Sequence, residues 1–243
     1  MSLATEYDQW HSKVFEADPE HADESSPWYQ LVLEFLPPVE GKRILEIACG
    51  RGGFSRVLAS KGATVCGGDF SESAIEIAKE KLRRFPGLSD RLTYIQADAQ
   101  SLPYESESFD IVISCETIEH VPDHRAAVRE MYRVCKPGGT LYLTTPNYLN
   151  FMGLYLIYAK VRHPGQKLTQ PLDKRYLFHQ VRDFVRKAGW KIVRTDGTVH
   201  QFPFIPRRNP VQFPSLESNR AIRRLLSPLA FHYFVIAQKG SAT

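Results

Sequence analysis

The strongest constraint on the fold of this chain is an alternation of short apolar runs with longer stretches of helical periodicity. Each apolar run is four to six residues long and almost continuously hydrophobic, as strands buried on both faces are. The runs are residues 43–47, 64–67, 92–96, 109–114 and 140–144. The helical stretches between them are residues 53–61, 71–85 and 123–134. This alternation predicts an α/β fold with a parallel sheet, in which ligands bind at the carboxyl ends of the strands.

Cap and turn residues mark the ends of two of these helices. Ser71 precedes the second helix as an N-cap, and Gly138 and Gly139 stop the third and begin a turn. Beyond residue 145 the alternation ends, and we expect an irregular segment at 146–170. The elements expected after it are a helix at 171–188, a strand at 191–195, a short basic helix near 216–226 and a final strand at 233–238. The connection to that final strand holds too little helix for a standard crossover.

Length and composition are those of one elaborated domain, with 243 residues, 43% of them hydrophobic and 24% charged. The longest apolar run, residues 151–159, is far shorter than the roughly 20 residues that span a bilayer. The first residues lack the basic and apolar regions of a secretory signal. The four cysteines lie far apart in apolar segments and are expected to be reduced core thiols. Together these features predict a cytoplasmic protein.

Charge is distributed unevenly along the chain. Residues 1–159 hold 15 Lys and Arg against 23 Asp and Glu, whereas residues 160–243 hold 16 against 4. A basic C-terminal part suits an anionic substrate, an acidic membrane surface or nucleic acid. The alternative is that its basic helices only complement the acidic first part.

The most informative segment is residues 46–53, Glu-Ile-Ala-Cys-Gly-Arg-Gly-Gly, where a strand leads through a glycine-rich turn into a helix. Glycine lets the backbone approach a ligand closely, and the helix N-terminus points at that ligand. A dinucleotide site is disfavoured, because the Gly-x-Gly-x-x-Gly pattern counted from Gly50 places Ser55 at its last position.

Residues 46–52 resemble motif I of class I S-adenosylmethionine-dependent methyltransferases, usually Glu/Asp-x-Gly-x-Gly-x-Gly, with Ala48 replacing the first glycine. Further segments resemble that family in the same order over residues 41–146: the acidic end of the second strand, the Ala-Asp-Ala adenine site, the fourth strand and the Lys-Pro-Gly-Gly turn. The resemblance implies S-adenosyl-L-methionine as cofactor, with Asp69 accepting from the ribose hydroxyls and Asp98 from the adenine amine. The cofactor-binding residues that it implies are Glu46, Ala48, Gly50, Gly52, Asp69, Phe70, Asp98, Ala99 and Cys115.

The resemblance also implies a Rossmann-like sheet of seven mostly parallel strands, with helices on both faces and the last strand antiparallel. Residues 1–243 then form a single methyltransferase domain. Within it, residues 1–40 form an N-terminal arm or lid and residues 41–146 the cofactor-binding core. Residues 146–243 supply a substrate insert and the C-terminal part of the sheet.

Methyl transfer from a sulfonium needs an aligned acceptor lone pair, and it needs a base where the acceptor must lose a proton. After the fourth strand, Glu116-Thr-Ile-Glu-His120 resembles the Glu-x-x-Glu-His of quinone-pathway O-methyltransferases and of RNA-end methyltransferases, in which the acids and His can hold a metal. We take His120 as the catalytic base, while a metal ligand and a packing residue stay open as alternatives. No metal site is predicted, because no further ligand is evident.

The acceptor is expected to contact the N-terminal arm and the insert after the fifth strand, because the strand ends are occupied by cofactor residues. The candidate acceptor-binding residues are Tyr7, Trp10, His11, Phe151 and Tyr155. The aromatic insert fits an apolar pocket, a lipid surface or a dimer face, so peripheral membrane contact and a homodimer stay open.

These features favour methylation of a small, hydrophobic acceptor, most of all at a hydroxyl. N-methylation of a small amine, RNA methylation through the basic C-terminal part and a cofactor-binding protein without catalysis are the alternatives. Nucleic acid is disfavoured because the basic residues lack the aromatic interleaving of a strand-binding platform.

Overall fold

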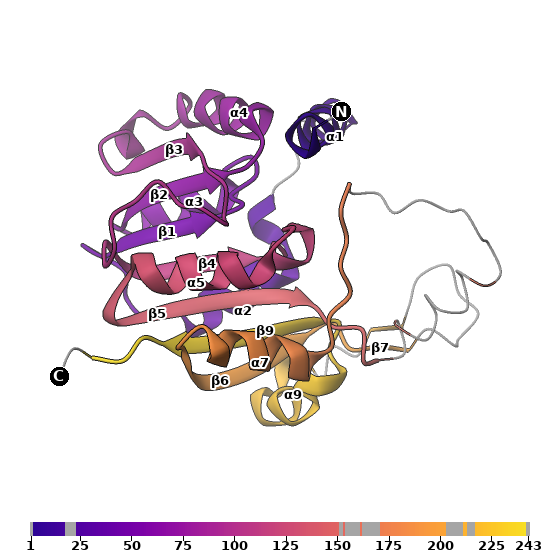
Figure 1. The fold of residues 1–243 in the computed structure, drawn as a ribbon. Helices are drawn as coiled ribbons and strands as arrows, with labels where there is room; N and C mark the ends of the chain where they lie inside the picture. The colour runs from indigo at the N-terminus through magenta and orange to yellow at the C-terminus, as the bar shows by residue number, and fades with distance from the viewer. Residues whose placement is uncertain are drawn as a thin grey trace.

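The computed structural model describes residues 2–17, 23–150, 153, 161, 171–202, 211–212 and 217–241. The strands of its main sheet are β1 (Arg43–Ile47), β2 (Thr64–Asp69), β3 (Leu92–Gln96), β4 (Phe109–Cys115), β5 (Cys135–Pro146), β6 (Lys191–Thr198) and β9 (His232–Gln238). They lie in the order β3-β2-β1-β4-β5-β9-β6 (Figure 1). Two short strands, β7 (Gln201–Phe202) and β8 (Val211–Gln212), pair separately.

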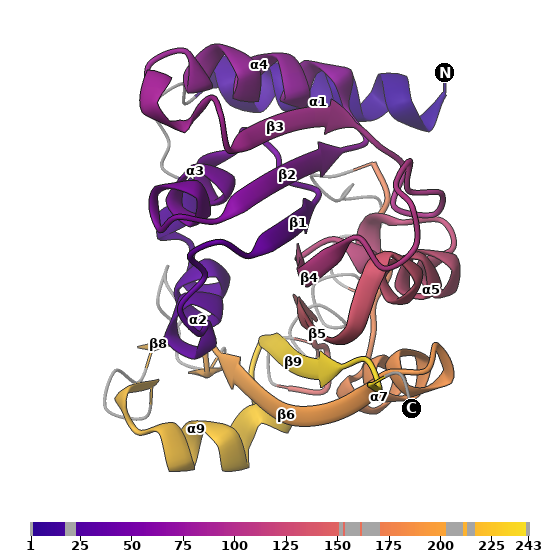
Figure 2. The same ribbon diagram turned by 90° about the vertical axis from the view of Figure 1, so that its left-hand side faces the viewer.

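Seven α-helices in the described residues surround this sheet. They are α1 (Leu3–Ala17), α2 (Pro27–Phe35), α3 (Gly53–Ser60), α4 (Glu72–Leu82), α5 (His124–Val134), α7 (Phe178–Lys187) and α9 (Arg220–Leu226). Single 3-10 turns are η1 (Asp23–Ser25), η2 (Pro86–Leu88), η3 (Ile118–His120) and η4 (Ser227–Leu229). Helices α5 and α7 cover one face of the sheet, and α2, α3 and α4 cover the other (Figure 1). Helix α1 packs alongside α4 (Figure 2).

The core is divided by the sheet because successive strand residues point to opposite faces. In β1, Leu45 and Ile47 pack with α5 and α7, whereas Ile44 packs with α2, α3 and α4. Burial of both sheet faces explains why the strand sequences are continuously apolar. The prediction of a seven-stranded sheet with helices on both faces is confirmed.

Strand β9 is antiparallel to both of its neighbours, β5 and β6, and the other strand pairs joining β1 to β5 are parallel. This arrangement confirms the predicted antiparallel last strand. It also places the first residue of β9, His232, beside Pro146 at the end of β5. His232, although it begins its strand, therefore lies at the edge of the sheet where the parallel strands end.

The expected strands at 43–47 and 92–96 are confirmed to the residue, and the helix expected at 171–188 is wrong in its first turns. Helix α7 begins at Phe178, and the segment before it is extended. The backbone N–H of Lys174 donates to the Glu119 carbonyl, and the N–H of Tyr148 donates to the Tyr176 carbonyl. These tertiary hydrogen bonds replace the intrahelical ones, so the first turns of the expected helix do not form.

An ion-pair network joins the basic C-terminal part to the rest of the fold. Arg223 of α9 donates to Asp196 of β6 at 2.9 Å and to Glu34 of α2 at 2.8 Å. Arg220 pairs with the same Glu34 carboxylate. The fully buried Asp196 carboxylate is compensated by this arginine and by Arg194, whose Nη2 lies 3.2 Å from Asp196 Oδ2. At these positions, basic residues complement acidic ones, as one of the two interpretations of the charge pattern expected.

Candidate functional site

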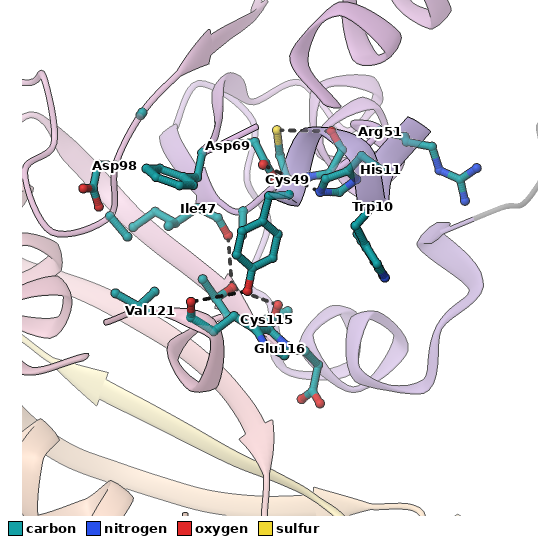
Figure 3. A pocket seen from close by; sticks show the side chains of 18 of the residues that line it. Trp10, His11, Ile47, Cys49, Arg51, Asp69, Asp98, Cys115, Glu116 and Val121 are labelled. Atoms are coloured by element: carbon teal, nitrogen blue, oxygen red, sulfur yellow. Dashed lines mark hydrogen bonds and ion pairs between the residues drawn. The ribbon is translucent and has the colours of Figure 1, made fainter. Parts of the chain in front are cut away.

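A pocket of about 480 Å³ lies at the carboxyl ends of β1 to β4. Helices α1 and α2, the loops after the strands, and the first residue of β9 form its walls (Figure 3). Asp69 and Glu116 lie on opposite sides of the pocket in the close-up, with Trp10 and His11 beside the space between them. Most of the predicted site residues line it: Tyr7, Trp10, His11, Ala48, Gly50, Asp69, Phe70, Asp98, Ala99, Cys115 and His120.

The glycine-rich turn after β1 uses left-handed backbone at three alternating positions. Ala48 has φ 57°, Gly50 has φ 51° and Gly52 has φ 73°. Ala48 thus adopts the conformation that glycine favours at this place in the motif. Gly52 does not line the pocket, because it packs below the turn against the ring of Tyr94, whose hydroxyl donates to the Gly52 carbonyl at 2.8 Å.

Glu46 also lies outside the pocket lining. Its side chain is buried, and one of its oxygens accepts a hydrogen bond from the Ser55 hydroxyl at the start of α3. This contact ties β1 to the helix that follows the turn. In the structure, Glu46 and Gly52 support the turn through their contacts with Ser55 and Tyr94. Their cofactor roles stay predictions.

Asp69, at the end of β2, holds the turn in place from the other side. Its Oδ2 accepts from the Gly50 backbone N–H and its Oδ1 from the Ser71 backbone N–H, both at 2.9 Å. His11 Nε2 lies 3.9 Å from Oδ1. A carboxylate offers about four acceptor positions, so two remain for ligand hydroxyls after these backbone bonds.

Asp98 follows β3 on the next wall of the pocket. Its carboxylate accepts from the backbone N–H of Gln100 at 2.8 Å and from the Gln100 side-chain amide at 3.0 and 3.1 Å. These bonds fix the direction of the carboxylate. Its predicted contact with an adenine amine stays a prediction.

Helix α1 forms one wall of the pocket. The Tyr7 hydroxyl lies 3.4 Å from the His120 carbonyl and 3.5 Å from the Leu172 carbonyl, to which it donates. Asp8 Oδ1 accepts from the Ser71 hydroxyl at 2.7 Å and the Ser73 backbone N–H at 3.3 Å, which docks α1 on the start of α4. The arm is therefore attached to both walls. The other predicted acceptor residues, Phe151 and Tyr155, lie outside the described residues.

His120 ends η3 at the edge of the pocket, and both of its ring nitrogens face protein groups. Nδ1 contacts the Leu172 carbonyl, and Nε2 lies 3.6 Å from Glu119 Oε1. Burial lowers the pKa of His120 below its usual 6.5, so the ring is neutral near pH 7. A neutral ring with a carbonyl at Nδ1 carries its proton there and keeps the Nε2 lone pair.

The neighbouring Glu119 is almost fully buried. Burial, together with the charge of Glu116, raises the pKa of Glu119 well above its usual range. Its Oε2 accepts from the Thr145 hydroxyl at 2.9 Å. Glu119 is therefore a carboxyl group that holds η3 against β5 from inside the fold.

The sequence analysis missed a second histidine in the pocket. His232 lines it, and its Nδ1 lies 2.8 Å from Glu116 Oε2. The indole of Trp28, from α2, stands 4.9 Å from the His232 ring. A signal for His232 existed, because the beginning of an antiparallel last strand must lie at the carboxyl ends of its neighbours.

Glu116, Glu119 and His120 do not have a common interaction partner. Glu116 pairs with His232 and Glu119 with Thr145. Across the described parts of the chain, no group of three or more His, Cys, Asp or Glu is placed to hold a metal ion.

Among the described residues, no helix has the length and apolarity that crossing a membrane requires.

Comparison with known proteins adds to this geometry. Residues 45–143 match the family model described as a methyltransferase domain. The chain is 38% identical over 141 residues to demethylmenaquinone methyltransferase from Clavibacter sepedonicus, which covers 57% of this chain and 56% of that protein. It is 33% identical over 140 residues to ubiquinone biosynthesis O-methyltransferase from Pseudomonas putida, with 57% and 58% covered. The chain thus spans about half the length of the curated relatives it matches.

Among solved structures, a possible histamine N-methyltransferase from Thermotoga maritima resembles this chain with a TM-score of 0.68. The two chains are 20% identical, and the match covers 98% of this chain and 100% of the other. At this identity the likeness concerns the fold alone.

Proposed function

We propose that this chain, which belongs to the class I S-adenosylmethionine-dependent methyltransferases through its domain at residues 45–143, methylates a hydroxyl of a small hydrophobic acceptor. The methyltransferase-domain match and the two curated relatives support the family, enzyme class and cofactor predicted from the sequence. The hydroxyl and the nature of the acceptor are the proposal. The observation that carries it is the Asp69 carboxylate, fixed by two backbone N–H groups at the rim of a pocket whose other wall is aromatic.

The residues on the strand ends suit the cofactor. Asp69 retains acceptor capacity for two ribose hydroxyls, and Asp98 with Ala99 stands where an adenine ring would lie. The left-handed turn at Ala48 and Gly50 exposes backbone to the ligand. Bound there, S-adenosylmethionine supplies an electrophilic methyl group on its sulfonium. The chain orients that methyl group and excludes water from the space in front of it.

The remaining pocket wall supports a hydrophobic acceptor. Tyr7 and Trp10 from α1, Trp28 from α2, and Val121 after η3 all line it. Flat aromatic rings are suitable surfaces for a planar or aliphatic acceptor body. One relative is named a demethylmenaquinone methyltransferase and another a ubiquinone biosynthesis O-methyltransferase. The second name favours a hydroxyl of a hydrophobic molecule. A hydroxyl must lose its proton during transfer, and the pocket offers histidine for that step.

Cofactor binding is tested by calorimetry with S-adenosylhomocysteine. We expect the parent protein to bind it and to melt at a higher temperature in its presence. Asp69→Ala should weaken binding at least tenfold, because a hydrogen bond to a charged group contributes about 1.5 to 3 kcal/mol. Glu76→Ala, an exposed carboxylate on α4, is the matched control and should bind normally. Equal affinity in the two variants would contradict the assignment of Asp69.

The acceptor is tested by mass spectrometry of a metabolite extract treated with the protein and a cofactor carrying an isotope-labelled methyl group. The expected products are methyl ethers of hydrophobic alcohols or phenols. If the main labelled product is an amine, the activity is N-methylation and the proposed O-methylation is wrong. Label found in RNA, together with salt-dependent binding of RNA to the protein, would show that the acceptor is a nucleic acid instead.

A further inference from the structure

The pocket contains a carboxylate–histidine pair formed by two segments far apart in the chain. Glu116 follows β4 and His232 begins β9, 116 positions later, and their Oε2 and Nδ1 atoms lie 2.8 Å apart. The His232 side chain is 9% exposed and that of Glu116 is 14% exposed. Both residues line the pocket, so this pair belongs to its surface rather than to the core behind it.

The backbone at Glu116 is held in an uncommon conformation. Its φ is 49°, in the left-handed region that costs a residue with a side chain about 1 kcal/mol or more. The Glu116 N–H donates to the Thr144 carbonyl at 3.0 Å and lies 3.2 Å from the Thr144 hydroxyl oxygen. Strand β5 thus enforces the turn, which carries the Glu116 side chain to His232. Strain of this kind is typical of functional sites, where the surrounding structure maintains it.

The carboxylate determines which ring nitrogen of His232 carries the proton. Since a carboxylate only accepts, a neutral His232 must hold its proton on Nδ1 and donate it to Glu116. The lone pair is then on Nε2, which has no hydrogen-bond partner in the part of the chain that the structure describes. The ring centroids of Trp28 and Phe231 lie 4.9 and 4.8 Å from that of His232, so both rings pack against it.

His120 differs in the group that its Nδ1 contacts and in the group that its Nε2 faces. Its Nδ1 contacts a neutral carbonyl, which cannot compensate an imidazolium charge as a carboxylate does. Its Nε2 faces the buried Glu119 at 3.6 Å. His120 thereby joins η3 to the extended segment before α7, and its geometry is that of a positioning residue.

We propose that His232, oriented by Glu116, is the general base that accepts the acceptor's hydroxyl proton. This inference rests on the proposed function. As the acceptor oxygen forms its bond to the methyl carbon, the carbon–sulfur electron pair passes to sulfur and the hydroxyl proton passes to His232 Nε2. The imidazolium then donates to the Glu116 carboxylate until the proton leaves to water. The products are a methyl ether, S-adenosylhomocysteine and one proton.

The tautomer is tested by nitrogen NMR of the isotope-labelled full chain saturated with S-adenosylhomocysteine. Histidine signals are assigned with His232→Gln and His120→Gln. We expect His232 to carry its proton on Nδ1, and added phenol, used as a hydroxyl probe, to shift the Nε2 signal of His232. A proton on Nε2 of His232, or a phenol response at His120 alone or at neither histidine, overturns the proposal.

Glu116→Gln should let His232 populate both tautomers, because the amide can donate as well as accept. Glu119→Gln is the matched control, a neighbouring buried carboxyl that does not touch His232, and should leave its tautomer unchanged. With the acceptor found by label transfer, His232→Gln should lower kcat about 10²-fold or more with unchanged S-adenosylhomocysteine affinity. An equal loss in His120→Gln would overturn the assignment.

The two proposals fail in different ways. If S-adenosylhomocysteine does not bind the parent protein, the proposed function fails, and the His232 tautomer is still measurable in the free protein. If the cofactor product binds but phenol does not reach His232, only the base assignment fails.

Discussion

The two walls of the pocket are built in different ways. The wall proposed to bind the cofactor, called the cofactor wall below, consists of the turn after β1 and the ends of β2 and β3, all within residues 46–99. It is held by backbone donors such as those of Gly50 and Ser71. The opposite wall combines α1, α2, the segment after β4 and the first residue of β9. Its contacts join residues 113 and 116 positions apart.

This difference shows which parts of the pocket can be recognised from the sequence and which depend on tertiary packing. A wall made of consecutive strand ends can be recognised from spacing, because each βαβ unit returns the chain to the same edge. A wall made of remote side chains depends on how well the elements behind it are fixed. Four experiments separate the two walls, beginning with the largest expected effect.

Loss of Arg223 should affect the acceptor wall most. Arg223→Met removes one of the two arginines paired with the fully buried Asp196, leaving Arg194. It also removes one of the two arginines paired with Glu34 on α2, the helix that carries Trp28, leaving Arg220. Breaking a buried ion pair from one side costs about 3 to 5 kcal/mol. Urea denaturation should show this loss, whereas the exposed Arg224→Met changes stability little. A loss below about 1 kcal/mol would mean that α2 is held without Arg223, by the remaining pairs of Arg194 and Arg220 and by apolar packing.

Gly52→Ala is the corresponding change on the cofactor wall. A methyl group there would overlap the Tyr94 ring, and the left-handed backbone disfavours it further. Overpacking and strain together should cost about 2 to 4 kcal/mol and weaken S-adenosylhomocysteine binding. Gly87→Ala, in η2 with open space around it, is the control for thermal unfolding. Normal cofactor affinity in Gly52→Ala would show that the turn tolerates displacement.

Asp8→Ala tests whether α1 is attached through the start of α4. The variant loses the acceptor for the Ser71 hydroxyl and the Ser73 N–H, worth about 1 kcal/mol as for other caps. Trypsin cleavage at the exposed Lys13 should therefore become several-fold faster. Gln9→Ala, exposed on the same helix, should be cleaved at the parent rate. An unchanged rate in Asp8→Ala would place the attachment of α1 at Tyr7 instead.

The smallest effect concerns the pH dependence of stability at His120. Burial holds the pKa of His120 below 6.5, so the folded state binds fewer protons than the unfolded state just below that pH. Stability of the parent therefore falls as pH decreases through the window between pH 6.5 and the lowered pKa of His120. His120→Gln should lose less stability across that window, and the exposed His179→Gln should behave as the parent does. Parallel curves for parent and His120→Gln would contradict this shift.

Prediction from the sequence succeeded where structure depends on near neighbours. Ser71 caps α4 as expected, with its hydroxyl accepting from the Ala74 N–H at 3.2 Å, since capping is decided within four residues. The beginning of α7 could not be predicted in this way. The segment before it forms hydrogen bonds with Glu119 and with Tyr148, neither of which periodicity can identify.

The sequence by itself determined the strands, their alternation with helices, the glycine-rich turn and the acids that follow β2 and β3. Those features are encoded in apolar period and in local backbone preference, which act over a few residues. Only the tertiary structure decided that Glu116 faces His232, that Arg223 pairs with Asp196, and that His120 Nδ1 contacts the Leu172 carbonyl. Such pairs arise when a completed sheet brings remote side chains within about 3 Å, where burial makes each charge depend on its partners.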